Sequence, residues 1–157
     1  MPEAAPTDDP AALTSYIETR YHRTHREQLP DLAALALKVE RVHADHPKTP
    51  KGMGALLQHL IGVLEVHMKK EELILFPAIR PGGMQGLDVP IAVMRADHDH
   101  HQAEVAQIRV LTNDLTLPEG ACRSWTALYD GLTGFLADLD THIRLENEVL
   151  FPRFETV

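Results

Sequence analysis

The sequence predicts an all-α fold, an up-down-up-down four-helix bundle, and three observations support this prediction. Apolar residues recur every three or four positions along most of the chain, with almost no alternation of period two. Three short stretches rich in proline, glycine or polar residues divide the chain into four long amphipathic segments. The length of 157 residues suits one globular domain with a single core. Four long helices joined by short connections are typical of such a bundle.

The first helix is expected to follow a flexible N-terminal tail, residues 1–8. Asp8 or Asp9 can act as the N-cap, and Pro10 then falls in the first turn, where its missing N–H breaks no helical hydrogen bond. Pro30 lies inside this segment, so the helix either kinks or breaks there, and we favour a continuous helix with a kink. Its apolar stripe contains Leu13, Ile17, Tyr21, Leu29, Leu32, Ala36 and Val39.

Three further helices complete the predicted domain, which covers residues 9–157. Each is expected to end where a proline or a polar turn interrupts the apolar pattern. The connections are residues 46–52, 81–83 and 113–119. The helices are expected to run from about Gly52 to Phe76, from about Pro90 to Leu111, and from Pro118 or Glu119 to Phe151.

The charge and the cysteine content exclude several classes of protein. A formal net charge of −8 opposes binding to nucleic-acid phosphates. No apolar run reaches the roughly 18 to 20 residues that a membrane helix needs, and the N-terminal residues lack the pattern of a signal peptide. Cys122 is the single cysteine, which excludes an internal disulfide and a cysteine-based metal cage. We therefore expect a cytoplasmic protein without a nucleic-acid or membrane partner.

Ten histidines stand out in this composition, and two of them belong to a repeat at the ends of the second and fourth segments. His67 to Pro77 and His142 to Pro152 both follow the pattern H-x3-E-x3-L-F-P. Residues four apart lie on one face of a helix, so each histidine and its glutamate point the same way. Imidazole with carboxylate is a ligand set for iron or manganese, and zinc also accepts it. The repeat therefore predicts a metal site inside the bundle.

The distance of each histidine from the connecting turns allows one histidine from every helix to reach a common layer. Two metal ions are expected there, each with two imidazoles, and both glutamates bridge them. The predicted metal ligands are His22, His67, Glu71, His98, His142 and Glu146. Tyr21 and Asp97 are expected beside these ligands, where they could orient them or pass protons. Core positions are predicted for Leu75, Phe76, Leu150 and Phe151.

The other histidines have different expected roles. His43 lies 21 residues after His22, about 31 Å along one helix, so it joins the site only if the chain reverses at Pro30. We leave it out, although the segment Glu40-x-x-His43 also fits a carboxylate–imidazole element. His25, one turn from His22, would replace it if the first helix were rotated. A structural or surface role is expected for His46, His59, His100 and His101.

The pattern resembles the hemerythrin-like domains, and more narrowly the C-terminal di-iron domain of the bacterial iron-sulfur cluster repair proteins. The resemblance covers nearly the whole chain and rests on specific segments. These are Arg20–His22, His25–Pro30, Lys38–Asp45, the HMKKEELILFP segment from His67, and the HIRLENEVLFPR segment from His142. It implies two iron ions in a non-haem centre with oxo or hydroxo and carboxylate bridges. It also implies that His43 recurs in the family, which keeps that residue open as a ligand.

The resemblance further implies a role in iron-sulfur cluster repair during nitrosative or oxidative stress. Nitric oxide or dioxygen would bind at the centre, with nitric oxide reductase-like turnover as one activity and damaged iron-sulfur proteins as partners. Two alternatives stay open: an oxygen or nitric oxide sensor or store without turnover, and an iron donor. Longer relatives carry a domain with two cysteines ahead of this region. Gln102 stands where a second histidine of an H-x3-H pair would follow His98, which argues against simple oxygen carriage.

Overall fold

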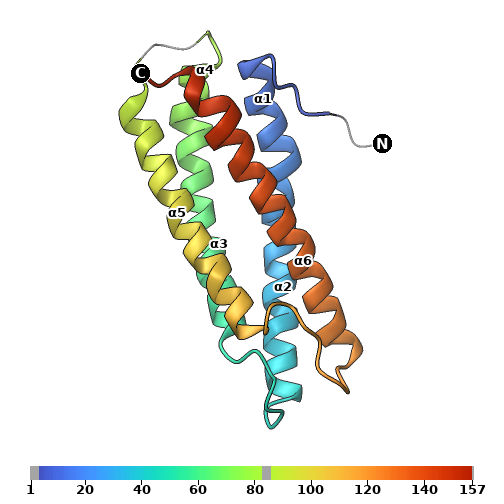
Figure 1. Ribbon diagram of the computed structural model, residues 1–157. Helices are drawn as coiled ribbons and strands as arrows, with labels where there is room; N and C mark the ends of the chain where they lie inside the picture. Colours follow the sequence, from blue (N-terminus) through green and yellow to red (C-terminus); the bar gives the residue numbers. More distant parts are fainter. Residues whose placement is uncertain (1–3, 83–85, 157) are drawn as a thin grey trace.

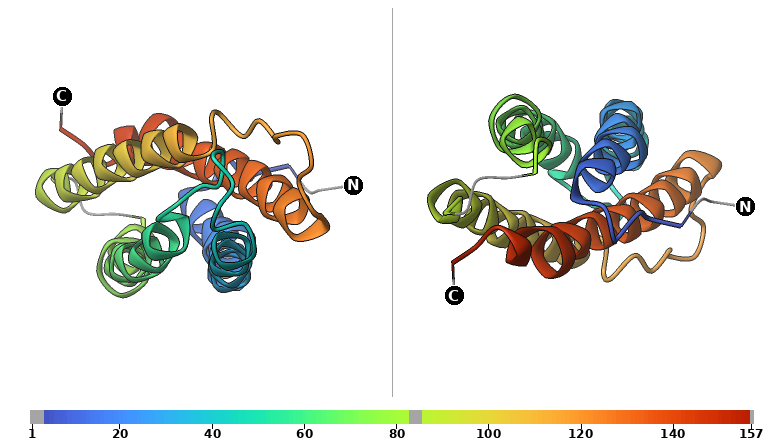
Figure 2. Two further views of the ribbon diagram at one scale, coloured as in Figure 1. Left: turned by 90° about the horizontal axis from the view of Figure 1, so that it is seen from below. Right: turned by 90° about the horizontal axis from the view of Figure 1, so that it is seen from above.

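The computed structural model describes residues 4–82 and 86–156, and it contains four long helical rods packed side by side (Figures 1 and 2). Within these residues no β-strand occurs, so the predicted all-α four-helix fold is confirmed. The first rod combines α1 (Pro10–Ile17), a π-helical turn (Glu18–His22) and α2 (Arg23–Val42). Asp9 is its N-cap and accepts a hydrogen bond from the Ala12 N–H.

The other three rods follow in alternating direction. The second consists of α3 (Met53–Lys70), a π-helical turn (Glu71–Leu75) and α4 (Phe76–Ile79). The third is α5 (Asp88–Leu111). The fourth consists of α6 (Arg123–Arg144), a π-helical turn (Leu145–Leu150) and a short 3₁₀ turn (Phe151–Arg153). Helix α2 packs against α3 and α6, and α3 packs against α5.

Prolines end fewer helices than the sequence pattern predicts. The first rod continues through Pro30, as we expected from the sequence. The second and fourth rods do not stop at Phe76 and Phe151 but run to Ile79 and Arg153. In both, the proline falls at the start of a new helical segment that follows a π-helical turn, a position that requires no N–H donor.

The start of the fourth helix also differs from the prediction. Helix α6 begins at Arg123, rather than at Pro118 or Glu119. Gly120 has a φ of 84°, a left-handed conformation that cannot continue a right-handed helix, so residues 118–122 form a turn instead. The predicted tail, residues 1–8, lies partly outside the described residues, as does part of the 81–83 connection. Within the described ranges, no helix is long and apolar enough to cross a membrane.

The buried interior has two apolar clusters with a polar layer between them. The larger cluster extends from the layer toward the 46–52 and 113–122 connections and includes Leu57, Trp125 and Phe135. The smaller cluster fills the end where α1 and α4 lie and includes Phe76 and Phe151. The layer between them contains eight residues with at most 2% exposure, namely His22, His25, His67, Glu71, His98, His101, His142 and Glu146. A polar layer of this size lowers the stability of a small folded domain unless its groups are paired or hold ions.

Candidate metal centre

The structure brings together all six residues that the sequence predicts as metal ligands. Three of them lie in the π-helical turns: His22 ends the first, Glu71 begins the second, and Glu146 lies in the third. A π-helical turn inserts one extra residue and so re-aims the side chains beside it, and such turns are frequent at functional sites. The helix irregularities of this protein are therefore concentrated at the polar layer.

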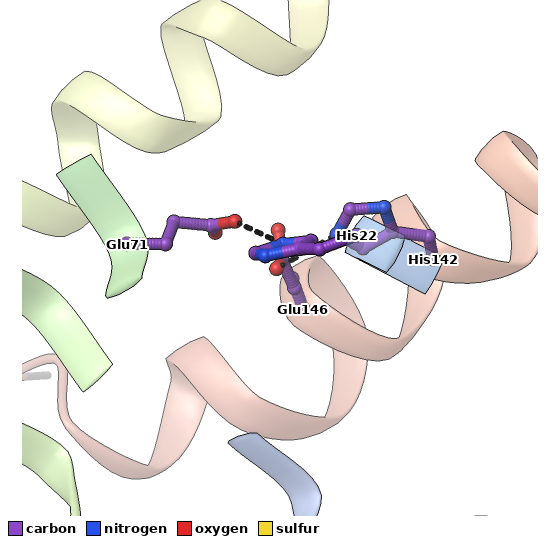
Figure 3. Close-up of side chains that lie close together, drawn as sticks. All are labelled: His22, Glu71, His142 and Glu146. Carbon is purple, nitrogen blue, oxygen red and sulfur yellow. Dashed lines mark hydrogen bonds and ion pairs between the residues drawn. The ribbon is translucent and has the colours of Figure 1, made fainter. Parts of the chain in front are cut away.

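Glu71 lies between histidines from the first and second rods. Its Oε1 atom is 3.1 Å from Nε2 of His22 and 3.5 Å from Nε2 of His67. Its other oxygen, Oε2, has no hydrogen-bond partner among the residues that the structure describes, although it is fully buried. Figure 3 shows Glu71 reaching toward His22 and Glu146 from the opposite side of the layer.

Glu146 occupies the equivalent position between the third and fourth rods. Its Oε1 atom is 2.9 Å from Nε2 of His98, and its Oε2 atom is 3.0 Å from Nε2 of His142. The contact with His98 lacks hydrogen-bond alignment, and both of its atoms remain without a partner in the described part of the chain. Two atoms that lie close together without forming a hydrogen bond are expected when both are aimed at the same cation.

The donor atoms form two overlapping groups that share both glutamates. Among the described residues, His22, Glu71, His142 and Glu146 offer donor atoms within 4.8 Å of one another. A second group of the same kind consists of His67, Glu71, His98 and Glu146. Each group thus has two imidazoles and two carboxylates, and each takes one histidine from either half of the chain. This is the arrangement expected for two cations joined by carboxylate bridges.

The second ring nitrogen of His22 and of His98 is held by a residue that the sequence pattern did not single out. Nδ1 of His22 donates to the Glu72 carboxylate at 2.8 Å. Nδ1 of His98 donates to Oδ1 of Asn147 at 2.7 Å. Glu72 and Asn147 each follow a shared glutamate directly, so the repeat extends by one position. This position is polar in both copies of the repeat, and that shared polarity was the sequence feature that could have identified the two Nδ1 partners.

His67 and His142 are oriented by different neighbours. Nδ1 of His67 donates to Asp97 at 3.0 Å, which agrees with the expected place of Asp97 beside the ligands. Nδ1 of His142 lies 3.1 Å from Nε2 of His25, so His25 supports His142 instead of replacing His22. Tyr21 stacks on His142 with ring centroids 5.5 Å apart. All four Nδ1 atoms are therefore occupied, and all four Nε2 atoms face a glutamate.

Burial keeps two of these imidazoles, those of His22 and His67, neutral at physiological pH. Burial, together with the neighbouring His142, lowers the pKa of His22 to about 4. Burial likewise lowers the pKa of His67 to about 4. A neutral imidazole has one N–H, so His22 cannot donate to Glu72 and to Glu71 at once. The conflict disappears when Nδ1–H serves Glu72 and the Nε2 lone pair faces a cation.

The two buried glutamates also cannot both carry a negative charge without compensation. Burial, reinforced by the charge of Glu146, raises the pKa of Glu71 well above its ordinary value. Burial acts in the same direction on Glu146, but His142 and His98 outweigh it and hold the pKa of that carboxyl well below its ordinary value. Two adjacent buried carboxylates are compatible with full ionisation only if positive charge lies between them. The residues present therefore fit a pair of divalent or trivalent cations.

Aromatic rings close the layer on the side of the smaller apolar cluster. Phe76 stacks on His22 with centroids 5.9 Å apart and an interplanar angle of 11°. Phe151 stacks on His98 at 5.8 Å and 6°. Both phenylalanines are fully buried, as expected for core residues. The L-F-P part of the repeat thus covers the histidines of the neighbouring rods.

His43, the histidine left open as a further ligand, lies away from the polar layer. Nε2 of His43 is 3.1 Å from Sγ of Cys122, and its ring packs 4.9 Å from that of Trp125 at the far end of the larger cluster. Glu40 accepts hydrogen bonds from the N–H groups of Gly52 and Gly54. The segment Glu40-x-x-His43 is therefore used for a helix cap and a cysteine contact.

Comparison with known proteins agrees with this geometry. The chain matches the family described as "Hemerythrin HHE cation binding domain" over residues 14–154. It is 50% identical over 141 residues to the iron-sulfur cluster repair protein YtfE of Yersinia pseudotuberculosis serotype O:1b (strain IP 31758). It is 49% identical over 141 residues to the protein of that name from Yersinia pestis (strain Pestoides F). Each match covers 90% of this chain and 64% of the relative's length.

Proposed function

This chain belongs to the hemerythrin HHE cation-binding domain family, and we propose that it is a non-haem di-iron protein of the iron-sulfur cluster repair type. In this proposal it binds nitric oxide or dioxygen at a carboxylate-bridged centre and acts in the response to nitrosative and oxidative stress. The expected setting is the cytoplasm, where a lone cysteine stays reduced.

The observation that carries this proposal is the convergence of four histidine Nε2 atoms on two glutamates that both donor groups share. His22 and His142 would hold one ion, and His67 and His98 the other. Glu71 and Glu146 would bridge them. Imidazole with carboxylate suits iron better than calcium or magnesium, which prefer oxygen ligands alone. Manganese and zinc remain the competing metals for this ligand set.

A bound di-iron pair would supply electron exchange with a small ligand and an open coordination position. The chain itself supplies orientation and a dry interior. Glu72, Asn147, Asp97 and His25 fix the direction of each imidazole through its Nδ1 atom. Burial of the layer keeps bulk water from the centre and favours small uncharged molecules over large polar ones.

The repair role comes from the relatives and is the finer part of the proposal. The iron-sulfur cluster repair proteins named above are about half identical to this chain over 141 residues, and the family match over residues 14–154 contains the whole polar layer. This chain spans 64% of their length, so the activity of the whole relatives is a proposal for this chain and not a finding. Damaged iron-sulfur proteins are the partners that the proposed repair role implies.

Metal analysis together with absorption spectroscopy tests the proposal. We expect two irons per chain and near-ultraviolet absorption from the oxidised pair in protein purified without added metal. Glu71→Leu and Glu146→Leu should each lose at least one iron while circular dichroism stays helical. Glu27→Leu on the exposed face of α2 is the matched control and should keep both irons. Retention of both irons in both site variants, or wild-type protein that binds zinc instead, would contradict the assignment.

Reaction with nitric oxide separates the activities that the centre could support. Steady formation of nitrous oxide in the presence of a reductant would establish turnover, because two nitric oxide molecules, two electrons and two protons give nitrous oxide and water. A stable nitric oxide complex without product would instead identify a binding module. Transfer of iron to a metal-free iron-sulfur protein would identify a donor.

A further inference from the structure

A second pair of histidines lies one helical turn from two of the proposed ligands. His25 follows His22 by three residues, and His101 follows His98 by three residues. The exposed fraction is 0% for His25 and 1% for His101. Residues three apart share a helix face, so each of these histidines borders the polar layer. Neither belongs to the two groups of converging donor atoms.

The two histidines differ in how their nitrogen atoms are used. Nε2 of His25 accepts a hydrogen bond from Nδ1 of His142, as described above. His101 has no hydrogen-bond partner for either nitrogen within residues 4–82 and 86–156. The adjacent His100, by contrast, is exposed to solvent. A buried imidazole with both nitrogens unpaired is unfavourable in the folded chain and therefore calls for an explanation.

The position of His101 places it against one particular donor group. Its ring lies 4.9 Å from the ring of His67 in a perpendicular arrangement, and 6.1 Å from the ring of His98. His101 cannot support His67 as His25 supports His142, because Asp97 already accepts the hydrogen bond from Nδ1 of His67. The imidazole of His101 therefore lies beside the group of His67 and His98 and makes no hydrogen bond there within the described residues.

The opposite side of the layer is unsuitable for a polar ligand. There the rings of Phe76 and Phe151 stack on His22 and His98, and the apolar residues around them belong to the smaller core cluster. A small molecule that enters the layer can find a hydrogen-bond donor on the His101 side and an apolar wall on the Phe151 side. The asymmetry favours binding next to His101.

We propose that His101 is a positioning residue that donates a hydrogen bond to a small ligand bound at the group of His67, Glu71, His98 and Glu146. Suitable ligands are diatomic or triatomic molecules that carry partial negative charge on a terminal atom, such as nitric oxide, dioxygen or azide. This inference rests on the proposed di-iron function and assigns its ligand to the half of the centre held by His67 and His98.

Azide binding to the oxidised, iron-loaded protein tests the proposal with three variants. His101→Leu removes the donor but keeps a side chain of similar size, His101→Gln keeps an N–H donor, and His100→Ala is the exposed control. We expect all three to bind two irons. The dissociation constant for azide should rise about tenfold in His101→Leu, with a shifted azide charge-transfer band, and should stay near the wild-type value in the other two.

A second measurement uses the metal-free protein. Because the unpaired imidazole is unfavourable there, His101→Leu should raise the melting temperature of the metal-free chain. A lower melting temperature would show that the imidazole has a structural partner and would overturn the proposal. Loss of an iron from His101→Leu would make His101 a ligand and overturn it equally. Unchanged azide affinity with two irons bound would overturn this inference alone, whereas wild-type protein that binds no iron would overturn the proposed function with it.

Discussion

Nδ1 of His22 donates a hydrogen bond to the Glu72 carboxylate at 2.8 Å, and Nε2 of the same ring faces the proposed metal position. Arg26 holds Glu72 in place through a contact of 2.7 Å and also pairs with Glu65. This chain of charges leads from the half-exposed Arg26 to a fully buried imidazole. It fixes the tautomer of His22 and increases the basicity of its Nε2 atom.

Replacing Glu72 should therefore weaken metal binding without removing a ligand. Glu72→Ala leaves Nδ1 of His22 without its acceptor, and we expect the affinity for the ion nearest His22 to fall about 10- to 100-fold. Competition with a chelator measures this loss. Glu65→Ala is the control, because it removes a partner of Arg26 but touches no histidine of the layer. Equal affinity in both variants would show that Glu72 does not orient the ligand.

The metal-free protein should lose stability as the pH falls from about 6.5 toward 4. The histidines His22, His25, His67 and His101 have pKa values lowered by burial, to about 4, about 2, about 4 and about 3 respectively. In the unfolded chain they titrate near 6.5, so the unfolded state binds more protons in this window, and acid favours it. The raised pKa values of Glu71 and His98 oppose this trend but involve fewer groups.

Urea unfolding at several pH values between 7.5 and 4.5 measures this dependence. The urea midpoint of the metal-free protein should be highest above pH 6.5 and fall steadily below it. Replacing the buried His101 by leucine removes one of the four groups and should make the slope shallower. A midpoint that stays constant, or rises on acidification, would contradict the assignment of neutral buried imidazoles.

Metal loading should stabilise the fold strongly because it resolves the conflict in the polar layer. A ligand present at 100 times its dissociation constant adds about 2.7 kcal/mol to the free energy of unfolding. In a domain of this size that corresponds to a rise in melting temperature on the order of 5–10 °C. Differential scanning calorimetry with and without iron measures it. Glu146→Leu removes an oxygen donor from both groups and should show a much smaller rise.

The sequence predicted the four-helix fold and brought the six proposed ligands to one layer because both depend on regular spacing. The number of residues between a histidine and the nearest turn gives its position along the bundle axis. The spacing of four residues shows that each histidine and its glutamate share one helix face. The π-helical turns could not be predicted from this spacing, because each inserts one residue into a helix whose apolar pattern continues. Two of them lie directly before the segments that contain Pro77 and Pro152, and the first ends at His22, the ligand that the spacing predicted and that faces Glu71.

The partners of the Nδ1 atoms were harder to predict for a related reason. Asn147 and Glu72 contact histidines on a neighbouring rod, and the rotation of one rod against the next is not encoded in the spacing within either. His101 shows the same limit. Its spacing from His98 is compatible with a surface position, and its burial comes from packing between helices, with the ring of His67 on α3 against it. Repetition within the sequence was the better guide, since Glu72 and Asn147 occupy equivalent positions.

Glu40 provides a final test that separates stability from metal binding. Its carboxylate accepts hydrogen bonds from the N–H groups of Gly52 at 2.6 Å and Gly54 at 3.0 Å, and so it caps the N-terminus of α3 from α2. A carboxylate in this position satisfies unpaired helix donors and interacts favourably with the helix dipole. The neighbouring His43 contacts Cys122 instead of a metal.

Glu40→Ala should lower the free energy of unfolding by about 1 kcal/mol, because two helix N–H groups lose their acceptor. Glu40→Gln keeps an oxygen acceptor but loses the charge, and it should cost less. Urea unfolding of the metal-free protein measures both changes. Iron content should remain at two per chain in either variant, since the cap lies at the opposite end of α3 from His67. A loss of iron in Glu40→Ala would instead restore Glu40 and His43 as candidates for the metal centre.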